Sequence, residues 1–396
     1  MSSTRDILGK PLLTHELGSL DKPSWRVKAY AGVALDERDI EEARSWGTRL
    51  EVPDYVRLLD LLGRSSLDDA QRQEVRQWSS HYGLRLEESA GLDVVYDGEQ
   101  QRSEMYAWAV AHANGFEWRG SVRAFDNKYY SKAAVTGPIS LREPYHNAEF
   151  AFLRSVARAP LKVPVTGAYT IADWSFDEYF IRDHDLALTA ADRRKQRHEA
   201  RRTLVLELAR NLIRPNLQAL IDLGATWIQL DEPGASTDPE ELDLFVESFN
   251  VSVDGLDAVF STHLCFSDYD LFFPAIERMH GCRQFAVGFA NYDRRELGRS
   301  DEARPGYAVI KRFRDLPYRP ILGLGVLNIH SDFIESPELV RDRILYAVDV
   351  FGDPYRIHVT ADCGLRTRSW AVAFQKLVNM VAGVRLAKRE LGLSQV

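Results

Sequence analysis

Three residues in the second half of the chain have the types and spacing of a zinc site. His263 and Cys265 are two positions apart in STHLCFSDYD, and Cys363 lies in TADCGLRTRSW. On an extended strand, side chains two positions apart point to the same face. Two thiolates and an imidazole suit Zn²⁺, and three protein ligands with an open fourth position are typical of catalytic zinc. The three residues therefore predict a catalytic zinc site.

A cysteine can also be a small apolar residue of the core, because free Cys is among the most buried residue types. The chain has only 3 cysteines in 396 residues, too few for a disulfide framework. Cys282, in HGCRQF, has no partner motif and is predicted to be structural. The combination of a His-x-Cys with a distant Asp-Cys-Gly favours metal binding for the other two. Zinc held by thiolates lowers the pKa of a bound substrate thiol, so the predicted chemistry is alkyl transfer to a small thiol.

The elements that must position these residues follow an α/β pattern. Short β-type runs alternate with amphipathic helical stretches such as 200–224, which is typical of a parallel sheet. The eight candidate strands are 11–19, 92–99, 161–170, 225–233, 257–265, 283–290, 319–327 and 356–363. Eight parallel strands with crossover helices close most simply into a (β/α)8 TIM barrel. We expect one catalytic barrel domain over residues 1–396, with a helical insertion at 20–90 after the first strand and an extra hairpin at 116–139.

Most of these candidate strands end in residues that are capable of chemistry. The residues are Ser19, Glu99, Asp231 with Glu232, His263 with Cys265, and Cys363. In a TIM barrel the active site is built at the carboxyl ends of the strands. We therefore expect all of these side chains to converge on one mouth of the barrel.

Charge and hydropathy limit the partners of the whole chain. The formal net charge is -8, which argues against nucleic acid and anionic membranes as partners. The first ten residues contain no apolar signal core, and no stretch approaches a membrane-spanning length, so a cytoplasmic location is expected. The basic stretch 192–202 is predicted to be the solvated face of a helix. Docking of an acidic carrier protein is the alternative for this stretch.

Seven motifs resemble, in the same order, blocks of the catalytic half of the cobalamin-independent methionine synthase family. They are HELGSL (15–20), YDGEQQRSEM (96–105), VTGAYTIADWSF (165–176), IQLDEP (228–233), THLCFS (262–267), GLGVLNIHS (323–331) and VTADCGLRTR (359–368). The resemblance spans about residues 11–390 and is closest to the short core members, which lack the N-terminal barrel. It implies a TIM barrel and a zinc-dependent methyltransferase that activates the homocysteine thiol and methylates it to methionine.

The resemblance also implies a role for each matching residue. The implied roles are zinc ligands for His263, Cys265 and Cys363; homocysteine binding for Ser19, Glu99 and Asp231; proton donation to the leaving group for His330; and a donor-side aromatic wall for Trp174. Carboxylates suit the α-ammonium group, and a hydroxyl with nearby backbone N–H groups suits the carboxylate. The alternatives are a strand-terminating Asp-Glu-Pro, a Gly-Ser turn, a structural histidine and a packed core tryptophan.

The sequence departs from the family pattern in two respects. Gly288 stands where the family has a glutamate as fourth zinc ligand, and the nearby Asn291 and Asp293 do not fit that register. Three protein ligands still support catalytic zinc, with water or a weaker neighbour such as Asn291 in the fourth position. The missing N-terminal barrel removes surface that binds folate in full-length relatives. The methyl donor is therefore open between a methyl-corrinoid protein and methyltetrahydrofolate, with an accessory protein as a further expected partner.

Two other functions remain open from the sequence. The first is an epoxyalkane:coenzyme M-type zinc thiol alkyltransferase. Ser19, Glu99 and Asp231 argue against it, because an ammonium-binding carboxylate has no use for a sulfonate thiol. The second is a non-catalytic barrel that binds a metal or a thiol, which the departure at Gly288 suggests. The intact zinc motif and His330 argue against this second function.

Overall fold

Seven parallel strands form one curled sheet in the computed structural model, which describes residues 8–123, 129–181, 189–265 and 267–393. In spatial order the strands are β1 (Leu13–Thr14), β10 (Ile357–Thr360), β9 (Ile321–Gly325), β8 (Gln284–Val287), β7 (Val259–Leu264), β6 (Trp227–Asp231) and β4 (Val163–Thr166). Parallel bridges join His15 to Val94 and Val95 to Leu161. The segment that contains Val94 and Val95 therefore takes the eighth place in the barrel, between β1 and β4. The predicted TIM-barrel fold is confirmed.

Three predicted strands differ most from the structure. The predicted strand 11–19 is reduced to β1, and the predicted strand 161–170 ends at Thr166, before the helix Ala168–Asp173. The predicted strand 92–99 makes only the two isolated bridges. The chain leaves the extended conformation at Gly98, with a φ of 64°, and at Glu99, with a φ of 60°. Two consecutive residues in the left-handed region turn the backbone sharply and end any ladder. The site residue Glu99 therefore lies on a tight turn and not on a strand end.

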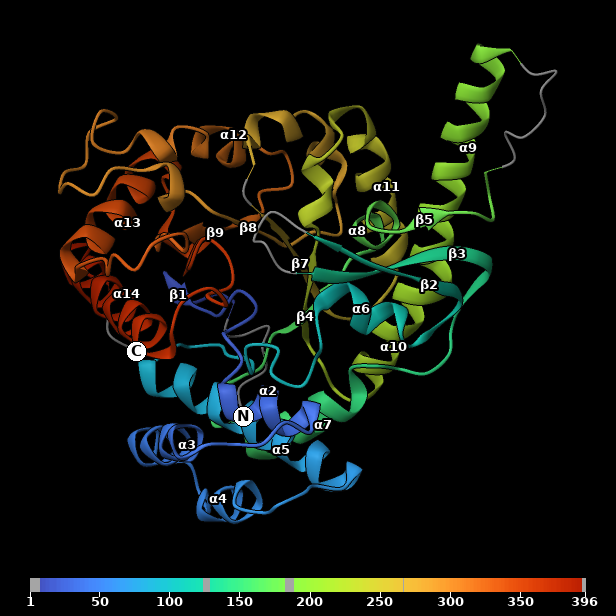
Figure 1. Cartoon of the computed structure of the whole chain (residues 1–396). Helices are drawn as coiled ribbons and strands as arrows, with labels where there is room; N and C mark the ends of the chain where they lie inside the picture. The colour runs from blue at the N-terminus through green and yellow to red at the C-terminus, as the bar shows by residue number, and fades with distance from the viewer. Residues whose placement is uncertain (1–7, 124–128, 182–188, 266, 394–396) are drawn as a thin grey trace.

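Helices follow the strands in the expected alternation. The helices of the predicted insertion are α2 (Ser24–Ala31), α3 (Glu37–Arg49), α4 (Val56–Leu62) and α5 (Asp69–Ala90). The remaining helices are α6 (Met105–Val110), α7 (Asn147–Val156), α8 (Ala168–Asp173), α9 (Ala190–Leu208), α10 (Arg214–Asp222), α11 (Leu242–Val253), α12 (Ile310–Arg314), α13 (Pro337–Phe351) and α14 (Trp370–Glu390). Figure 1 shows α2–α5 gathered at the lower end of the molecule, with α9 projecting at the upper end. None of the helices in the described ranges is both long and apolar enough to cross a membrane.

The predicted helical stretch 200–224 contains the end of α9 and all of α10, joined by a π-helical segment, Ala209–Ile213. Pro215 lies at the start of α10. Proline has no N–H to donate to the preceding turn, so a regular α-helical ladder cannot continue through this position. The basic stretch 192–202 lies on α9, and most of its side chains are exposed, as the sequence predicts.

The predicted extra hairpin consists of β2 (Ala113–Arg123) and β3 (Tyr129–Leu141), which pair antiparallel; residues 124–128 between them lie outside the described residues. A short strand, β5 (Phe176–Asp177), adds to β3. Arg366 donates to the hydroxyl of Tyr130 at 2.7 Å. This contact ties the hairpin to the loop that follows β10, on the mouth side of the barrel.

Candidate functional site

The structure brings the three predicted zinc ligands together. His263 is the penultimate residue of β7, Cys265 directly follows that strand, and Cys363 follows β10. Their candidate ligand atoms all lie within 4.8 Å of one another, and the two Sγ atoms are 3.3 Å apart. β7 and β10 are not consecutive strands, so the three residues come together only because the sheet closes into a barrel.

The donor set and its surroundings fit a zinc ion. The Nδ1 atom of His263 lies 3.1 Å from the carbonyl oxygen of Ala286 and can donate to it, which leaves Nε2 with a lone pair. That Nε2 atom is buried and faces no partner other than the thiol of Cys363. The adjacent Cys265 and burial raise the pKa of Cys363 well above its usual value, so a cation is needed to hold Cys363 as a thiolate. Cys282, by contrast, is buried and donates to the carbonyl of Gln284 at 3.1 Å, as expected for a structural cysteine.

Ser19 lies against the residue that follows Cys363. A Cβ atom added at Gly364 would lie 2.7 Å from the backbone nitrogen of Ser19. Only glycine allows the two loops to approach this closely. A small cavity of about 20 Å³, lined in part by Glu16, Gly18 and Cys363, lies between these loops. The hydroxyl and backbone of Ser19 are therefore close to the candidate metal ligands.

Asp231 ends β6 and pairs in register with His263 on β7. Its Oδ1 atom accepts a hydrogen bond from Nε2 of Gln229 at 2.7 Å. Burial raises the pKa of Asp231 to about 7, with His263 opposing this rise and the charge of Glu99 adding to it. A cation placed against Asp231 would hold the carboxylate ionised.

Glu232, the next residue, binds the start of α8 through its carboxylate. Its carboxylate accepts from the backbone N–H groups of Tyr169 at 3.2 Å and Thr170 at 2.8 Å, and from the Thr170 hydroxyl at 2.6 Å. Acceptors at this place satisfy the free N–H groups at the start of a helix, here α8. Burial raises the pKa of Glu232 to about 7.

Glu99 adopts a left-handed backbone conformation that non-glycine residues rarely take. Its N–H donates to Oδ1 of Asp97 at 2.8 Å, and its Oε1 lies 3.5 Å from the buried guanidinium of Arg102. Such conformations concentrate at functional sites, where the surrounding structure holds them. The side chain is buried, with 8% of its surface exposed, and its charge acts on Asp231.

Trp174 and His330 reach the mouth side from two loops. Trp174 is half-buried at the end of α8, and its ring lies 6.3 Å from the ring of Tyr106. His330 is exposed on the loop after β9, and its N–H donates to the side chain of Asn328 at 2.8 Å. Neither residue belongs to the group of three candidate ligands.

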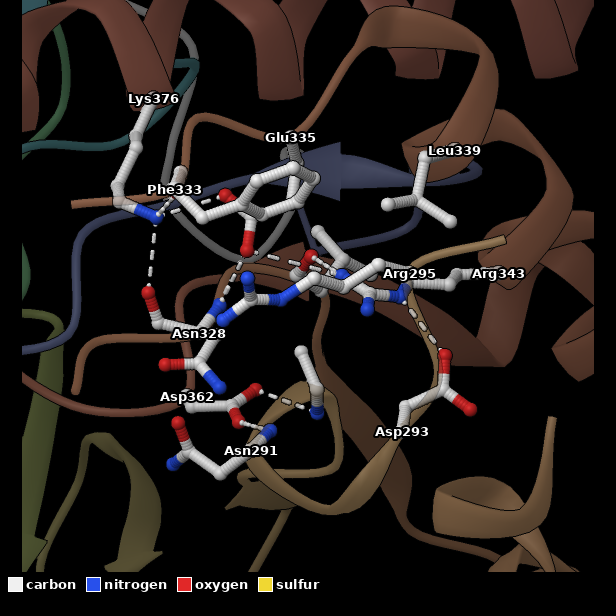
Figure 2. Close-up of polar contacts among 12 residues, drawn as sticks. Asn291, Asp293, Arg295, Asn328, Phe333, Glu335, Leu339, Arg343, Asp362 and Lys376 are labelled. Atoms are coloured by element: carbon white, nitrogen blue, oxygen red, sulfur yellow. Dashed lines mark hydrogen bonds and ion pairs between the residues drawn. The ribbon is translucent and has the colours of Figure 1, made fainter. Parts of the chain in front are cut away.

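A buried ion pair fixes the loop that carries His330. Nζ of Lys376, from α14, donates to Oε2 of Glu335 at 2.8 Å and to the carbonyl of Asn328 at 2.9 Å. Oε1 of Glu335 accepts from the N–H of Asn328 at 2.8 Å. Figure 2 shows this arrangement, with Arg343 reaching from Glu335 toward Asp293. The loop is thus held by charged groups that the sequence motifs did not indicate.

Asp362 lies beside Gly288, the position at which the sequence departs from the family pattern. A Cβ atom added at Gly288 would lie 2.9 Å from the Asp362 carbonyl oxygen and 3.0 Å from its Cβ. The Asp362 carboxylate accepts from the N–H groups of Phe289 at 3.1 Å, Ala290 at 3.0 Å and Asn291 at 2.5 Å. The space beside β8 is therefore closed by the residue that precedes Cys363. Burial raises the pKa of Asp362 to about 7.

Asn291 and Asp293, the polar residues nearest to Gly288 in the sequence after β8, both have partners in the structure. The Oδ1 atom of Asn291 accepts from the N–H of Ile329 at 3.2 Å. Asp293 is fully buried between Arg304 and Arg343, with its Oδ2 atom 2.9 Å from Arg343 Nε. Asn291 thus joins the loop after β8 to the loop after β9, and Asp293 joins it to α13 (Figure 2).

Some of the site's supporting residues had a signal in the sequence. Gln229 is two positions before Asp231, so on a strand the two share a face. Asp362 directly precedes Cys363 in a motif that matches the family. Lys376 and Glu335 had no such signal, because their pairing depends on how α14 packs against the loop after β9.

Comparison with known proteins places this arrangement in a family. The model of the family "Cobalamin-independent synthase, Catalytic domain" matches residues 53–386. A methionine synthase of Thermoplasma acidophilum is 33% identical over 386 residues, covering 93% of this chain and 96% of that protein. One of Thermococcus kodakarensis is 34% identical over 388 residues, covering 96% and 95%.

Solved structures give the same fold. A B12-independent methionine synthase from a Shewanella species, in complex with selenomethionine, has a TM-score of 0.71 at 20% identity, covering 96% of this chain and 99% of that one. A second, from Listeria monocytogenes, has a TM-score of 0.60 at 17% identity. With its seven motifs, its barrel and these relatives, the chain belongs to the cobalamin-independent methionine synthase family and is a methyltransferase.

Proposed function

We propose that this methyltransferase uses a zinc ion held by His263, Cys265 and Cys363 to methylate the sulfur of homocysteine, which gives methionine. The observation that carries the proposal is the grouping of one imidazole and two thiols within 4.8 Å, with the Nε2 atom of His263 buried beside the Cys363 thiol. Zinc bound there would lower the pKa of a substrate thiol and keep it as a thiolate at neutral pH.

The amino-acid part of homocysteine is bound beside this group. Asp231 and Glu99 supply carboxylates for the ammonium group, and the hydroxyl and backbone N–H of Ser19 donate to the carboxylate. Charge-assisted contacts to both groups fix the position and orientation of the α-carbon, so the side chain extends toward the metal ligands in one direction. A sulfonate thiol such as coenzyme M offers Asp231 and Glu99 no cation, and none of the relatives named above is an epoxide-opening transferase.

The methyl donor approaches from the side of Trp174 and His330. Trp174 offers an aromatic face to the donor. His330 gives a proton to the leaving group, and its exposure lets it recover a proton from solvent. Burial and the charge of Arg368 lower the pKa of His330, which makes its imidazolium form a stronger acid toward the leaving group. The donor is a methyl-corrinoid protein or methyltetrahydrofolate, with an accessory protein as a further candidate partner.

The whole chain, residues 1–396, acts in this proposal as one catalytic barrel domain in the cytoplasm, where reduced thiols persist. The test is conversion of homocysteine to methionine by the zinc-loaded protein, with methylcobalamin and methyltetrahydrofolate supplied separately. The Cys363→Ser variant should lose both zinc and product formation. Methylation of 2-mercaptoethanesulfonate as fast as of homocysteine, or full activity without zinc, would contradict the proposal.

A further inference from the structure

The interior of the barrel below the candidate site is unusually polar. TIM-barrel interiors are commonly filled by branched apolar side chains. Here His15, Lys162, Gln229, Gln284 and His358 are all fully buried, with 0% of their surfaces exposed. A buried ammonium group is costly unless every one of its hydrogens finds an acceptor, so Lys162 requires an explanation.

Lys162 directly precedes β4 and makes contacts in two directions. Toward β6, its Nζ atom donates to Oε1 of Gln229 at 2.6 Å. Toward the loop after β1, it donates to the carbonyl of Glu16 at 2.6 Å and lies 3.3 Å from Oε1 of the same residue. The ring of His15 lies 3.0 Å away through Nδ1, and Trp227 lies beneath the ammonium group.

The first direction leads to Asp231. An ammonium group can only donate hydrogen bonds and a carboxylate can only accept them. The side-chain amide of Gln229 must therefore turn its oxygen to Lys162 and its NH₂ to Oδ1 of Asp231, at 2.7 Å. This contact holds Asp231 in one rotamer. It leaves Oδ2 for a ligand, since no contact within the described part of the chain occupies that atom.

The second direction leads to Ser19. The Oε2 atom of Glu16 accepts from the N–H of Gly18 at 2.6 Å, so Glu16 fixes the backbone that carries Ser19. The N–H of Leu20 then donates to the carbonyl of Gly98 at 3.0 Å, next to Glu99. The loop after β1 is thus anchored to Lys162 at one end and to the Glu99 turn at the other.

We infer that Lys162 is a positioning residue for substrate selection: it aligns Asp231 through Gln229 for the ammonium group and Ser19 through Glu16 for the carboxylate. Lys162 contacts no reacting atom in this scheme. Lys162 thus sets the positions of two arms: the ammonium arm, Gln229 with Asp231, and the carboxylate arm, Glu16 with Ser19. The enzyme therefore takes a 2-amino acid thiol and discriminates against thiols that lack either charged group. The inference rests on the proposed homocysteine function and specifies how its amino-acid pocket is held.

The test is calorimetric titration of the zinc-loaded protein with three thiols at neutral pH. The thiols are homocysteine, 4-mercaptobutanoate, which lacks the ammonium group, and 3-mercaptopropylamine, which lacks the carboxylate. The Kd of each analogue divided by the Kd of homocysteine gives an ammonium ratio and a carboxylate ratio. For the wild type each ratio should be about ten to a hundred, the range for one charge-assisted hydrogen bond.

Two unbranched substitutions separate the arms. Lys162→Met should lower both ratios at least about fivefold, because it releases both arms, whereas Gln229→Met should lower only the ammonium ratio by a similar factor. Lys376→Met is the matched control, because Lys376 is another fully buried lysine, paired with Glu335 at 2.8 Å. It should lower the unfolding midpoint and leave both ratios unchanged. Zinc content and cooperative unfolding are measured for every variant, and Gln229→Met alone decides the ammonium arm if Lys162→Met does not fold.

The possible outcomes separate this inference from the function on which it rests. Wild-type ratios near one would overturn the homocysteine function itself, and this inference with it. Wild-type ratios in the expected range that persist in folded Lys162→Met would overturn only the positioning role. A loss of both ratios in Gln229→Met, or in the Lys376→Met control, would also overturn it, because general loosening of the barrel would then explain the effect.

Discussion

Glu99 combines a proposed substrate contact with a strained backbone, and this combination gives a test with two independent readouts. Its φ of 60° lies in the left-handed region, where a non-glycine residue costs roughly 1–2 kcal/mol. Glu99→Ala and Glu99→Gly both remove the carboxylate and its 3.5 Å contact with Arg102. They differ in backbone strain, which only glycine relieves.

The magnitude follows from two opposing effects. Glycine removes the strain in the folded state, but it also gives the unfolded chain more freedom, which costs about 0.4–1 kcal/mol. The Glu99→Gly variant should therefore be about 0.5–1 kcal/mol more stable than Glu99→Ala. Both variants should bind homocysteine about ten- to a hundredfold more weakly than the wild type, because each loses one charge-assisted contact with the ammonium group.

Urea unfolding measures the free energies, and calorimetry measures the homocysteine affinities. Glu51 is the matched control, since it is exposed and has a φ of 50°. Glycine and alanine at Glu51 should show a similar stability difference with unchanged homocysteine affinity. Equal stability of the two Glu99 variants would refute the strain argument. Wild-type affinity in both of them would remove Glu99 from the ammonium site.

Three further predictions concern the metal, the space beside β8 and the response to pH. Cys363→Ser should lose stoichiometric zinc while Cys282→Ser keeps it; full zinc in the first variant, measured by atomic absorption, would refute the ligand assignment. Gly288→Ala should cost about 1–3 kcal/mol in urea unfolding, because its Cβ atom would lie 2.9 Å from the Asp362 carbonyl oxygen; an unchanged midpoint would contradict this packing. Burial raises the pKa of Asp97 to about 7, above the unfolded value of about 3.9, so the native state retains a proton that the unfolded chain releases. The free energy of unfolding should therefore fall as pH rises between about 4 and 7, by up to ~1.4 kcal/mol per pH unit for this group. The Asp97→Asn variant should reduce that slope, measured by urea unfolding at several pH values. An identical slope in the variant would show that Asp97 is not the group responsible.

The sequence predicts the order and approximate place of the strands because apolar runs are local features, but the seven strands of the sheet end one to five residues earlier than predicted. His263, Cys265 and Cys363 were predicted as one group on that basis, and the closed barrel brings their ligand atoms within 4.8 Å. The sequence predicts a strand where the chain turns at Gly98 and Glu99, because composition alone does not reveal two successive positive φ angles.

Residues that support the site from a distance were harder to find. Lys376 and Glu335 are 41 positions apart in the sequence and meet only through the packing of α14 against the loop after β9. The role of Asn291 was equally hidden, and water or Asn291 in the fourth metal position stays a prediction. The side chain of Asn291 is used by Ile329, a contact across two loops that no sequence spacing indicates.

Gly288 and Asp362 are best understood as a pair. Gly288 leaves room for the backbone and Cβ atom of Asp362, and Gly325 leaves room for its carboxylate, since a Cβ atom at Gly325 would be 2.3 Å from the Oδ1 atom. Asp362 fills that space and is held there by the N–H groups of residues 289–291. A carboxylate with three such donors is committed to the backbone of the neighbouring loop. The β8 side thus contributes rigidity next to Cys363 in place of a fourth ligand, and a substrate thiol would meet no glutamate from that strand in competition for the metal.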